Sequence, residues 1–331
     1  MFRMGQRLLT LALVLSPAAL PNPASATILV HTWVASAAAG GNDSNNCDIA
    51  HPCADIYTAY QNTTAGGEIT CLNSGDFGDA SVDLSITKSI TINCEGAVGS
   101  ASTAAGGVQI QLLFVEISAG DVVVLRGLDF DLAGQGECLG GGGTIEFQGA
   151  GVLHIQKSKI SHSGECSGVY FEATGPAELD ISDSDITDNG TSGTMAGVSI
   201  VPNSGAAAQV SIDHSHINNN YYGVVADGRN GGTIQATISD SVVSGNTENG
   251  ITALSSGSSV VVMVDQTKVS GNLAGLFAGG SNTGILARNT TVFSNTVGLD
   301  TTGGGTLYTY GNNSVNGNTT NGAFTGTVAL Q

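Results

Sequence analysis

The sequence predicts an all-β protein, folded as a single-stranded right-handed parallel β-helix of about ten coils with a short N-terminal capping helix. Two observations predict this fold. A nine-residue pattern returns about every two dozen residues. The 48 glycines are accompanied by Val, Ile and Leu throughout a chain that is only 11% charged. This composition is typical of a β-solenoid and not of a disordered linker.

The repeated pattern is I-x-x-S-x-I-x-x-N, and each copy predicts one coil. Successive copies begin 26, 31, 26, 26, 23 and 23 residues apart. A unit of this size buries its apolar face only by stacking on its neighbours. The copies are Ile155–Ser163, Ile181–Asn189, Ile212–Asn220, Ile238–Asn246, Val264–Asn272, Ala287–Asn295 and Tyr310–Asn318.

Two columns of the aligned repeats predict the interior. Parallel stacking places equivalent residues of adjacent coils ~4.8 Å apart, so each column becomes a ladder. A uniformly β-branched column predicts the core. An asparagine column, with Ser163 in its first position, predicts an internal amide ladder at a turn. The columns are Ile160, Ile186, Ile217, Val243, Val269, Val292, Val315 and Asn189, Asn220, Asn246, Asn272, Asn295, Asn318.

The ends of an open solenoid need protection from edge-to-edge association. Pro52 to Gln61 predict a capping helix, because Ile56, Ala59 and Tyr60 have the spacing of an amphipathic face. No comparable cap is predicted at the other end, where we expect only an apolar strand near Val328 to Leu330.

Six cysteines predict disulfides in an oxidising compartment. Cys71 and Cys94 are 23 residues apart and Cys138 and Cys166 are 28 apart, about one coil in each case. Adjacent coils would hold these pairs at disulfide distance. Cys47 and Cys53 then close a small loop. This pairing is one of fifteen possible connectivities.

The N-terminus predicts an export signal. Arg3 and Arg7 precede the apolar run Leu8 to Leu15, and cleavage is expected near Ala26. We therefore expect a signal peptide over 1–26, an N-terminal strand, loop and capping helix over 27–66, and the β-helix over 67–331. The protein is expected to be secreted or periplasmic, with no transmembrane segment, because the apolar run is too short to span a bilayer.

Charge restricts the partners. After cleavage seven Lys and Arg remain against 27 Asp and Glu, which gives a formal charge of −20. Nucleic acid is therefore not expected to bind. Polyuronates would be repelled unless a cation such as Ca²⁺ bridged the contact, and no other cofactor is expected. Neutral glycans meet no such barrier.

Several N-terminal motifs resemble a known family. They are Trp33-Val-Ala-Ser, Gly41-Asn-Asp-Ser-Asn45, Pro52, Ile56, Gly66-Gly-Glu-Ile69 and Gly75-Asp-Phe-Gly78. This segment is similar to that of bacterial secreted right-handed parallel β-helix repeat proteins of the pectate-lyase-like superfamily. The resemblance implies the fold and no single activity, because the superfamily includes lyases, hydrolases, epimerases and adhesins.

The catalytic strings of the best-known relatives are missing. The polygalacturonase strings Asn-Thr-Asp, Gly-Asp-Asp, Gly-His-Gly and Arg-Ile-Lys do not occur. Val210-Ser-Ile-Asp-His214 resembles a pectate lyase segment, but Ser211 replaces its Trp and no Arg-x-Pro-x-x-Arg follows. Neither activity is predicted.

One outward cluster has residues suited to acid–base chemistry. Ladder geometry places Asp183 and Asp185 beside His214 and His216. Such a cluster suits proton transfer or a divalent metal, although no metal site is firmly predicted. The alternative is a solvated stripe of alternating charge, flanked by Lys157, Lys159 and Asp240, which only keeps the ladder soluble.

A second candidate is a turn. Tyr221 and Tyr222 precede a strand that leads to Asp227 and Arg229, a set suited to stacking on and bonding to a sugar, although such tyrosines also simply pack turns. The outward positions after each repeat glycine are unusually apolar, which indicates a partner-docking face or shielding by the long turns. They are Tyr170, Ser199, Val225, Thr252, Phe277, Glu172, Val201, Asp227, Leu254 and Gly279.

Three function classes follow. The preferred hypothesis is an exported β-helix protein that binds a polysaccharide or another cell-surface component without catalysis. The alternative is a carbohydrate-active enzyme, a polysaccharide lyase or hydrolase, that uses one of the two candidate clusters. A purely structural surface protein is the third. Neither the ligand nor the oligomeric state follows from the sequence.

Overall fold

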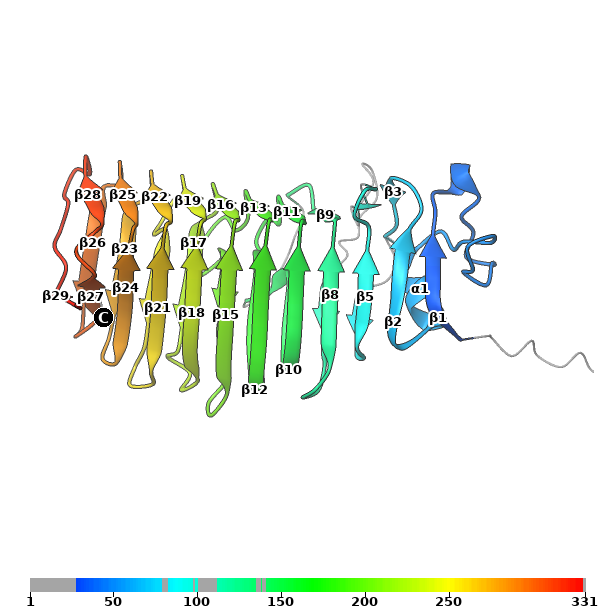
Figure 1. Ribbon diagram of the computed structural model, residues 1–331, viewed down its shortest axis with the longest axis horizontal. Coiled ribbons are helices and arrows are strands. Elements are labelled where there is room, and N and C mark those ends of the chain that lie inside the picture. Colours follow the sequence, from blue (N-terminus) through cyan, green and yellow to red (C-terminus); the bar gives the residue numbers. More distant parts are fainter. Residues whose placement is uncertain are drawn as a thin grey trace, which may run out of the picture.

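The computed structural model describes residues 28–78, 83–97, 99–100, 112–134, 138 and 141–329, so the expected signal peptide lies outside the described residues. The described chain forms a parallel β-solenoid of about nine turns, against about ten expected, with one short α-helix (Figure 1). The predicted fold class is confirmed.

Each regular coil contributes one strand to each of three parallel sheets. Successive coils pair in register, with Val198 opposite Val224, Val210 opposite Ala236 and Ile217 opposite Val243. Two such coils are β14 (Ala196–Ile200), β15 (Ala207–Asp213), β16 (His216–Asn218) and β17 (Tyr222–Asp227), β18 (Thr233–Ser239), β19 (Val242–Ser244).

The front sheet, which faces the viewer in Figure 1, contains the long strands. It begins with β1 (Leu29–Val34), which pairs with β2 (Thr63–Cys71). Its further strands are β5 (Ile90–Asn93), β8 (Val122–Arg126), the second halves of β10 (Gly143–Gln156) and β12 (Ser167–Ser182), β15, β18, β21 (Val260–Asp265), β24 (Thr283–Arg288) and β27 (Thr306–Thr309).

Two more sheets complete the solenoid. The short-strand sheet runs along the upper edge in Figure 1 and consists of β3 (Gly75–Asp76), β6 (Gly99–Ser100), β9 (Leu128–Asp131), β11 (Lys159–Ser161), β13 (Asp185–Thr187), β16, β19, β22 (Lys268–Ser270), β25 (Thr291–Phe293) and β28 (Ser314–Asn316). The rear sheet consists of β4 (Leu84–Ile86), β7 (Leu113–Val115), the first halves of β10 and β12, β14, β17, β20 (Ile251–Leu254), β23 (Ala274–Gly279) and β26 (Val297–Thr302).

Both predicted interior columns are confirmed. The β-branched column is fully buried from Ile160 to Val292, and only Val315, in the last coil, is partly exposed. In the asparagine ladder the side-chain amide of Asn220 donates to the Oδ1 of Asn246 at 3.2 Å, and the amide of Asn246 donates to Asn272 at 2.9 Å. Each Oδ1 also accepts the backbone N–H of the preceding asparagine. The ladder therefore joins adjacent coils through buried amides.

The corner between the front and short-strand sheets was not predicted. One residue there adopts positive φ in each regular coil, including Asp183 at 51° and His214 at 46°. The next residue is a buried Ser or Thr. Where it is Ser, its hydroxyl accepts a backbone N–H from the preceding coil, as when Ser215 accepts from Ser184 at 3.2 Å. Where it is Thr, the hydroxyl donates to a backbone carbonyl of the preceding coil. A left-handed residue at each copy turns the chain sharply without glycine.

The two ends are closed differently. The capping helix α1 (Ile56–Asn62) is confirmed, and it buries Ile56, Ala59 and Tyr60 as predicted. The described residues at the other end form no helix comparable to α1. An irregular segment lies over the last coil instead, in which Phe324 packs against the core and Thr325 bonds to the backbone of Leu307, and this segment was not predicted. The last strand is β29 (Gly326–Thr327), which lies before the expected position, and Leu330 lies outside the described residues.

The three predicted disulfides are present. Cys47–Cys53, Cys71–Cys94 and Cys138–Cys166 have Cα separations of 4.7, 4.7 and 5.1 Å. Such bonds are consistent with an extracellular or periplasmic protein. Among the described residues, no helix is long and apolar enough to span a bilayer.

Candidate functional site

The predicted acid–base cluster lies along the corner between the front and short-strand sheets. Asp183 and His214 occupy the left-handed corner position of adjacent coils. Asp185 and His216 begin β13 and β16 and are paired in register. The ladder geometry therefore places the four residues side by side, as the sequence indicated.

These four side chains do not converge on one point. Nδ1 of His216 lies 2.9 Å from Oδ1 of Asp185, whereas Nδ1 of His214 lies 2.6 Å from Oδ2 of Asp213. Asp183 and Asp185 instead line a depression of about 340 Å³ together with Lys157 and Lys159 of the preceding coil. Both imidazoles are more than half exposed, at 61% for His214 and 57% for His216. The cluster is thus divided into neighbouring pairs.

Asp213 is the partner that sequence reasoning missed. The ladder prediction assumed that the side chain of His214 points straight outward. The left-handed backbone of His214 instead brings its imidazole back onto Asp213, the residue before it. The hydrogen bond to Asp213 and its charge raise the pKa of His214. Partial burial acts to raise the pKa of Asp213, but hydrogen bonds from Ser239 and His214 hold it below its ordinary value.

The same corner brings three possible metal ligands together. Ligand atoms of Asp213, His214 and Asp240 all lie within 4.8 Å of one another. Two carboxylates and an imidazole are a donor set that divalent cations accept. Two of these residues are exposed, however, and the His214 Nδ1 is already engaged by Asp213.

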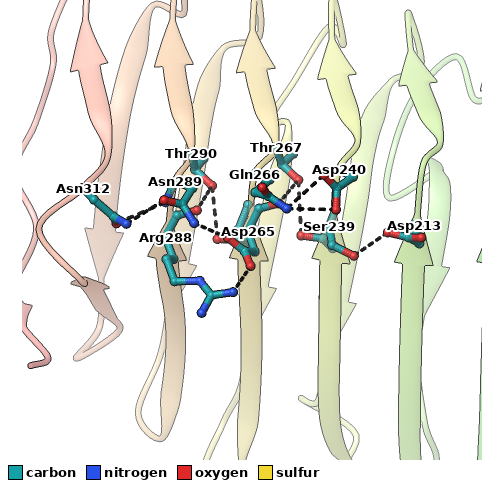
Figure 2. Close-up of polar contacts among 12 residues, drawn as sticks. Asp213, Ser239, Asp240, Asp265, Gln266, Thr267, Arg288, Asn289, Thr290 and Asn312 are labelled. Carbon is teal, nitrogen blue, oxygen red and sulfur yellow. Dashed lines mark hydrogen bonds and ion pairs between the residues drawn. The ribbon is translucent and has the colours of Figure 1, made fainter. Parts of the chain in front are cut away.

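Figure 2 shows that polar contacts of the same kind continue along the corner. Ser239 donates to Asp213 at 2.7 Å, and Gln266 donates to Asp240 at 3.0 Å. Further along, Arg288 donates to Asp265, and this hydrogen bond holds the pKa of Asp265 below its ordinary value. Because the coils from Asp213 to Asn312 are joined in this way, this part of the corner is a polar ladder that links coils.

The second candidate lies at the edge of the rear sheet. The rings of Tyr221 and Tyr222 meet edge to face, with centroids 5.3 Å apart. Arg229 donates to both carboxylate oxygens of Asp227 from Nε and Nη2, at 2.6 to 3.0 Å. Burial and the charge of Glu248 raise the pKa of Tyr222, and nearby Arg229 partly opposes them. The four predicted residues therefore form one region, in which Asp227 already satisfies the arginine.

On the outer face of the rear sheet, the burial favours one of the two alternatives stated for it. Ser199, Val225 and Thr252 are at most 8% exposed, so the chain itself shields them and they are not a free docking surface. Carboxylates gather around Tyr170. Burial raises the pKa of Tyr170, and the charges of Glu172, Glu146 and Asp227 raise it further. Burial is also the main cause of the raised pKa of Glu146, and the charge of Glu172 adds to it.

No family model and no curated protein matches the sequence. Two solved structures are similar to this chain. A rhamnogalacturonan lyase matches with a TM-score of 0.57 and 14% identity over 79% of this chain and 73% of that one. Pectate lyase Pel9A matches with a TM-score of 0.51 and 14% identity over 84% of this chain and 67% of that one. The chain has the pectate-lyase-like fold.

At 14% identity this likeness establishes the pectate-lyase-like fold alone. It confirms the fold that the N-terminal motifs implied. Which surface of this fold carries the function has to be argued from the side chains of the chain itself.

Proposed function

We propose that this protein is exported and binds a polysaccharide or another cell-surface component without cleaving it. One observation carries the proposal. The ionisable groups of the predicted cluster form separate exposed pairs, His216 with Asp185 and His214 with Asp213, instead of surrounding one reacting atom. Acid–base catalysis needs its groups within hydrogen-bond reach of one substrate position.

The fold and the charge support the same proposal. The two similar structures are, by their names, polysaccharide lyases, so the fold is compatible with a polysaccharide ligand. The formal charge of −18 for the whole sequence disfavours a polyanionic ligand. Calcium would enter only if an anionic polysaccharide were bound, as a bridge between the two negative partners.

The test is a panel of immobilised polysaccharides, with and without calcium, in which retention of the protein and release of reducing or unsaturated ends are both followed. We expect retention without product. Asp183→Ala and His214→Ala should leave retention unchanged. Product formation that disappears in either variant would establish a catalytic cluster, and neither retention nor product would favour a structural role.

One observation favours hydrolysis as the second candidate. Glu146 and Glu172 lie close enough for the charge of Glu172 to raise the pKa of Glu146. Gln148 is paired in register with Glu172 and donates to Glu146 at 2.6 Å, so the two carboxyls lie on adjacent strands beside one glutamine. Two neighbouring carboxyls are the groups that glycoside hydrolases use. Glu146→Gln abolishes any hydrolysis in the same panel if this pair is catalytic, and retention should survive.

A further inference from the structure

The outer face of the front sheet has two adjoining depressions. One, of about 380 Å³, lies over β12, β15, β18 and β21. The other, of about 340 Å³, continues it over β10, β12 and β15 toward the turn before β8. Glu178 and Gln209 line both, so the two form one groove that crosses five strands. With strands ~4.8 Å apart, the groove runs about 19 Å along the solenoid axis.

The groove has a row of long polar side chains along one side. Glu178 lies opposite Gln209, and Gln209 lies opposite Gln235, in the register of β12, β15 and β18. All three are exposed, and none makes a side-chain hydrogen bond to another described residue. Their amide and carboxylate groups therefore remain available to a ligand.

The floor and one end of the groove complement this row. Ser211 and Thr237 are paired in register and leave the floor low, because their side chains are short. Val261, which is 37% exposed, and Met263 add apolar surface at one end. Hydroxyl-sized donors beside C–H surface suit the alternating polar and apolar faces of a sugar ring.

Charge decides the class of sugar. In the part of the chain that the structure describes, neither lysine nor arginine lines the groove, and the carboxylates that line it are those of Glu178 and Asp180. Nδ1 of His154 lies 2.9 Å from Asp180, so that carboxylate is already partnered. A polyuronate would meet the unpaired negative charge of Glu178. Amides and hydroxyls instead match uncharged sugar hydroxyls.

We infer that this groove binds one chain of an uncharged polysaccharide, which lies along the solenoid axis. The inference rests on the proposed function and adds the place and the class of ligand. The direction follows from the register, since the same kind of side chain recurs at each strand crossing and a polymer offers the same hydroxyls at each unit. The groove lies on the front sheet, whereas Tyr221 and Tyr222 lie beside the rear sheet.

The experiment measures retention of the full chain on immobilised uncharged glucan and galactomannan, on polygalacturonate and on chitosan. The variants are the double substitution Gln209→Ala/Gln235→Ala and the groove-filling Ser211→Trp. The matched control is Gln148→Ala, an equally exposed glutamine on the rear sheet. Circular dichroism verifies that each variant is folded.

We expect retention on an uncharged polymer that is insensitive to salt. The double variant should bind about tenfold more weakly, since two net hydrogen bonds are lost, and Ser211→Trp should not bind. Gln148→Ala should bind normally. If the groove variants are retained as well as the wild type, and retention is lost in Tyr221→Ala/Tyr222→Ala, the assignment of the ligand to the groove is refuted. The proposed function would then still hold.

Two other results also refute the inference. Salt-sensitive retention on chitosan alone would refute an uncharged ligand, because it would show that carboxylates attract a cationic polymer. Retention on none of the four polymers would refute the proposed function itself as far as polysaccharides are concerned, and the groove assignment with it.

Discussion

The side-chain oxygen of Asn321 accepts two hydrogen bonds from Asn318, one from its backbone N–H at 3.3 Å and one from its side-chain amide at 3.1 Å. In the preceding coils the acceptor for both groups is the asparagine of the next coil, as Asn318 is for Asn295. Asn321 therefore ends the ladder within the last coil. Both donors of Asn318 are satisfied without another copy of the repeat.

Substitution of an asparagine in the interior of the ladder should lower stability far more than substitution of Asn321 at its end. Asn246→Ala removes the acceptor of two groups of Asn220, which leaves its buried backbone N–H without a partner and its side-chain amide with only the Ile186 carbonyl. We expect a loss of about 3 kcal/mol in the free energy of unfolding. Asn321→Ala, at an exposed position, should cost about 1 kcal/mol. Urea denaturation followed by circular dichroism measures both, and equal losses would contradict the ladder.

The left-handed backbone at the corner predicts that a substitution by glycine raises the stability of the protein. Gln266 has a φ of 48°, which a residue with a side chain adopts only at some cost. Gln266→Gly should therefore raise stability by up to about 1 kcal/mol, after the loss of its exposed hydrogen bond to Asp240. Gln266→Val should lower stability, since a β-branched side chain tolerates this conformation worst. A higher melting temperature for Gln266→Val than for Gln266→Gly would refute this account.

The pair formed by His214 and Asp213 predicts a pH dependence. The pKa of His214 is raised above 6.5, so its contribution to stability is complete below that pH and is lost as pH rises through the folded pKa. The pKa of Asp213 is lowered below 3.8, so its contribution is present above that pH and is lost as pH falls further. The pair should stabilise the fold most between these two values.

Nuclear magnetic resonance titration of the imidazole checks this directly. Asp213→Asn should lower the pKa of His214, because its largest favourable contact is removed. Asp185→Asn, which removes the partner of His216, serves as the control and should leave the titration of His214 unchanged. An unshifted His214 in Asp213→Asn would show that the hydrogen bond is not formed in solution.

The stability lost when a disulfide is removed should increase with the length of the loop that the disulfide closes. Replacing both Cys71 and Cys94 by Ser opens a loop between residues 23 apart, and we expect a loss of roughly 3 kcal/mol. Replacing Cys47 and Cys53, which are 6 apart, should cost about 1 kcal/mol less. Thermal unfolding of the two variants provides the comparison, and the reverse order would mean that native contacts, not chain entropy, dominate.

The sequence predicts the parts of this fold that repeat. Parallel stacking converts a column such as Ile160, Ile186 and Ile217 into a buried ladder, so the place of a residue in the repeat predicts its place in the fold. The disulfides and the amphipathic face of α1 follow from spacing in the same way. Each of these predictions depends only on which residues share a column or a face.

Features that follow from neither a repeated column nor a residue spacing are not predicted. The irregular segment over the last coil depends on Asn321, Phe324 and Thr325, which belong to no repeat. The pairing of His214 with Asp213 depends on a backbone angle that no residue type enforces, since Lys157 adopts it as well. The groove depends on short side chains beside long ones across adjacent strands, a contrast of size that a hydrophobic pattern does not record.

The coil-to-coil contacts make the length of this protein adjustable. Ile212 and Ile238 begin coils 26 residues apart, and these two coils are joined by amide, hydroxyl and aliphatic contacts. A duplication of that unit would reproduce its own neighbours and insert one more strand beneath the row of glutamines. Duplication in steps of one coil would thus lengthen the solenoid and its front sheet without requiring a new type of contact between coils.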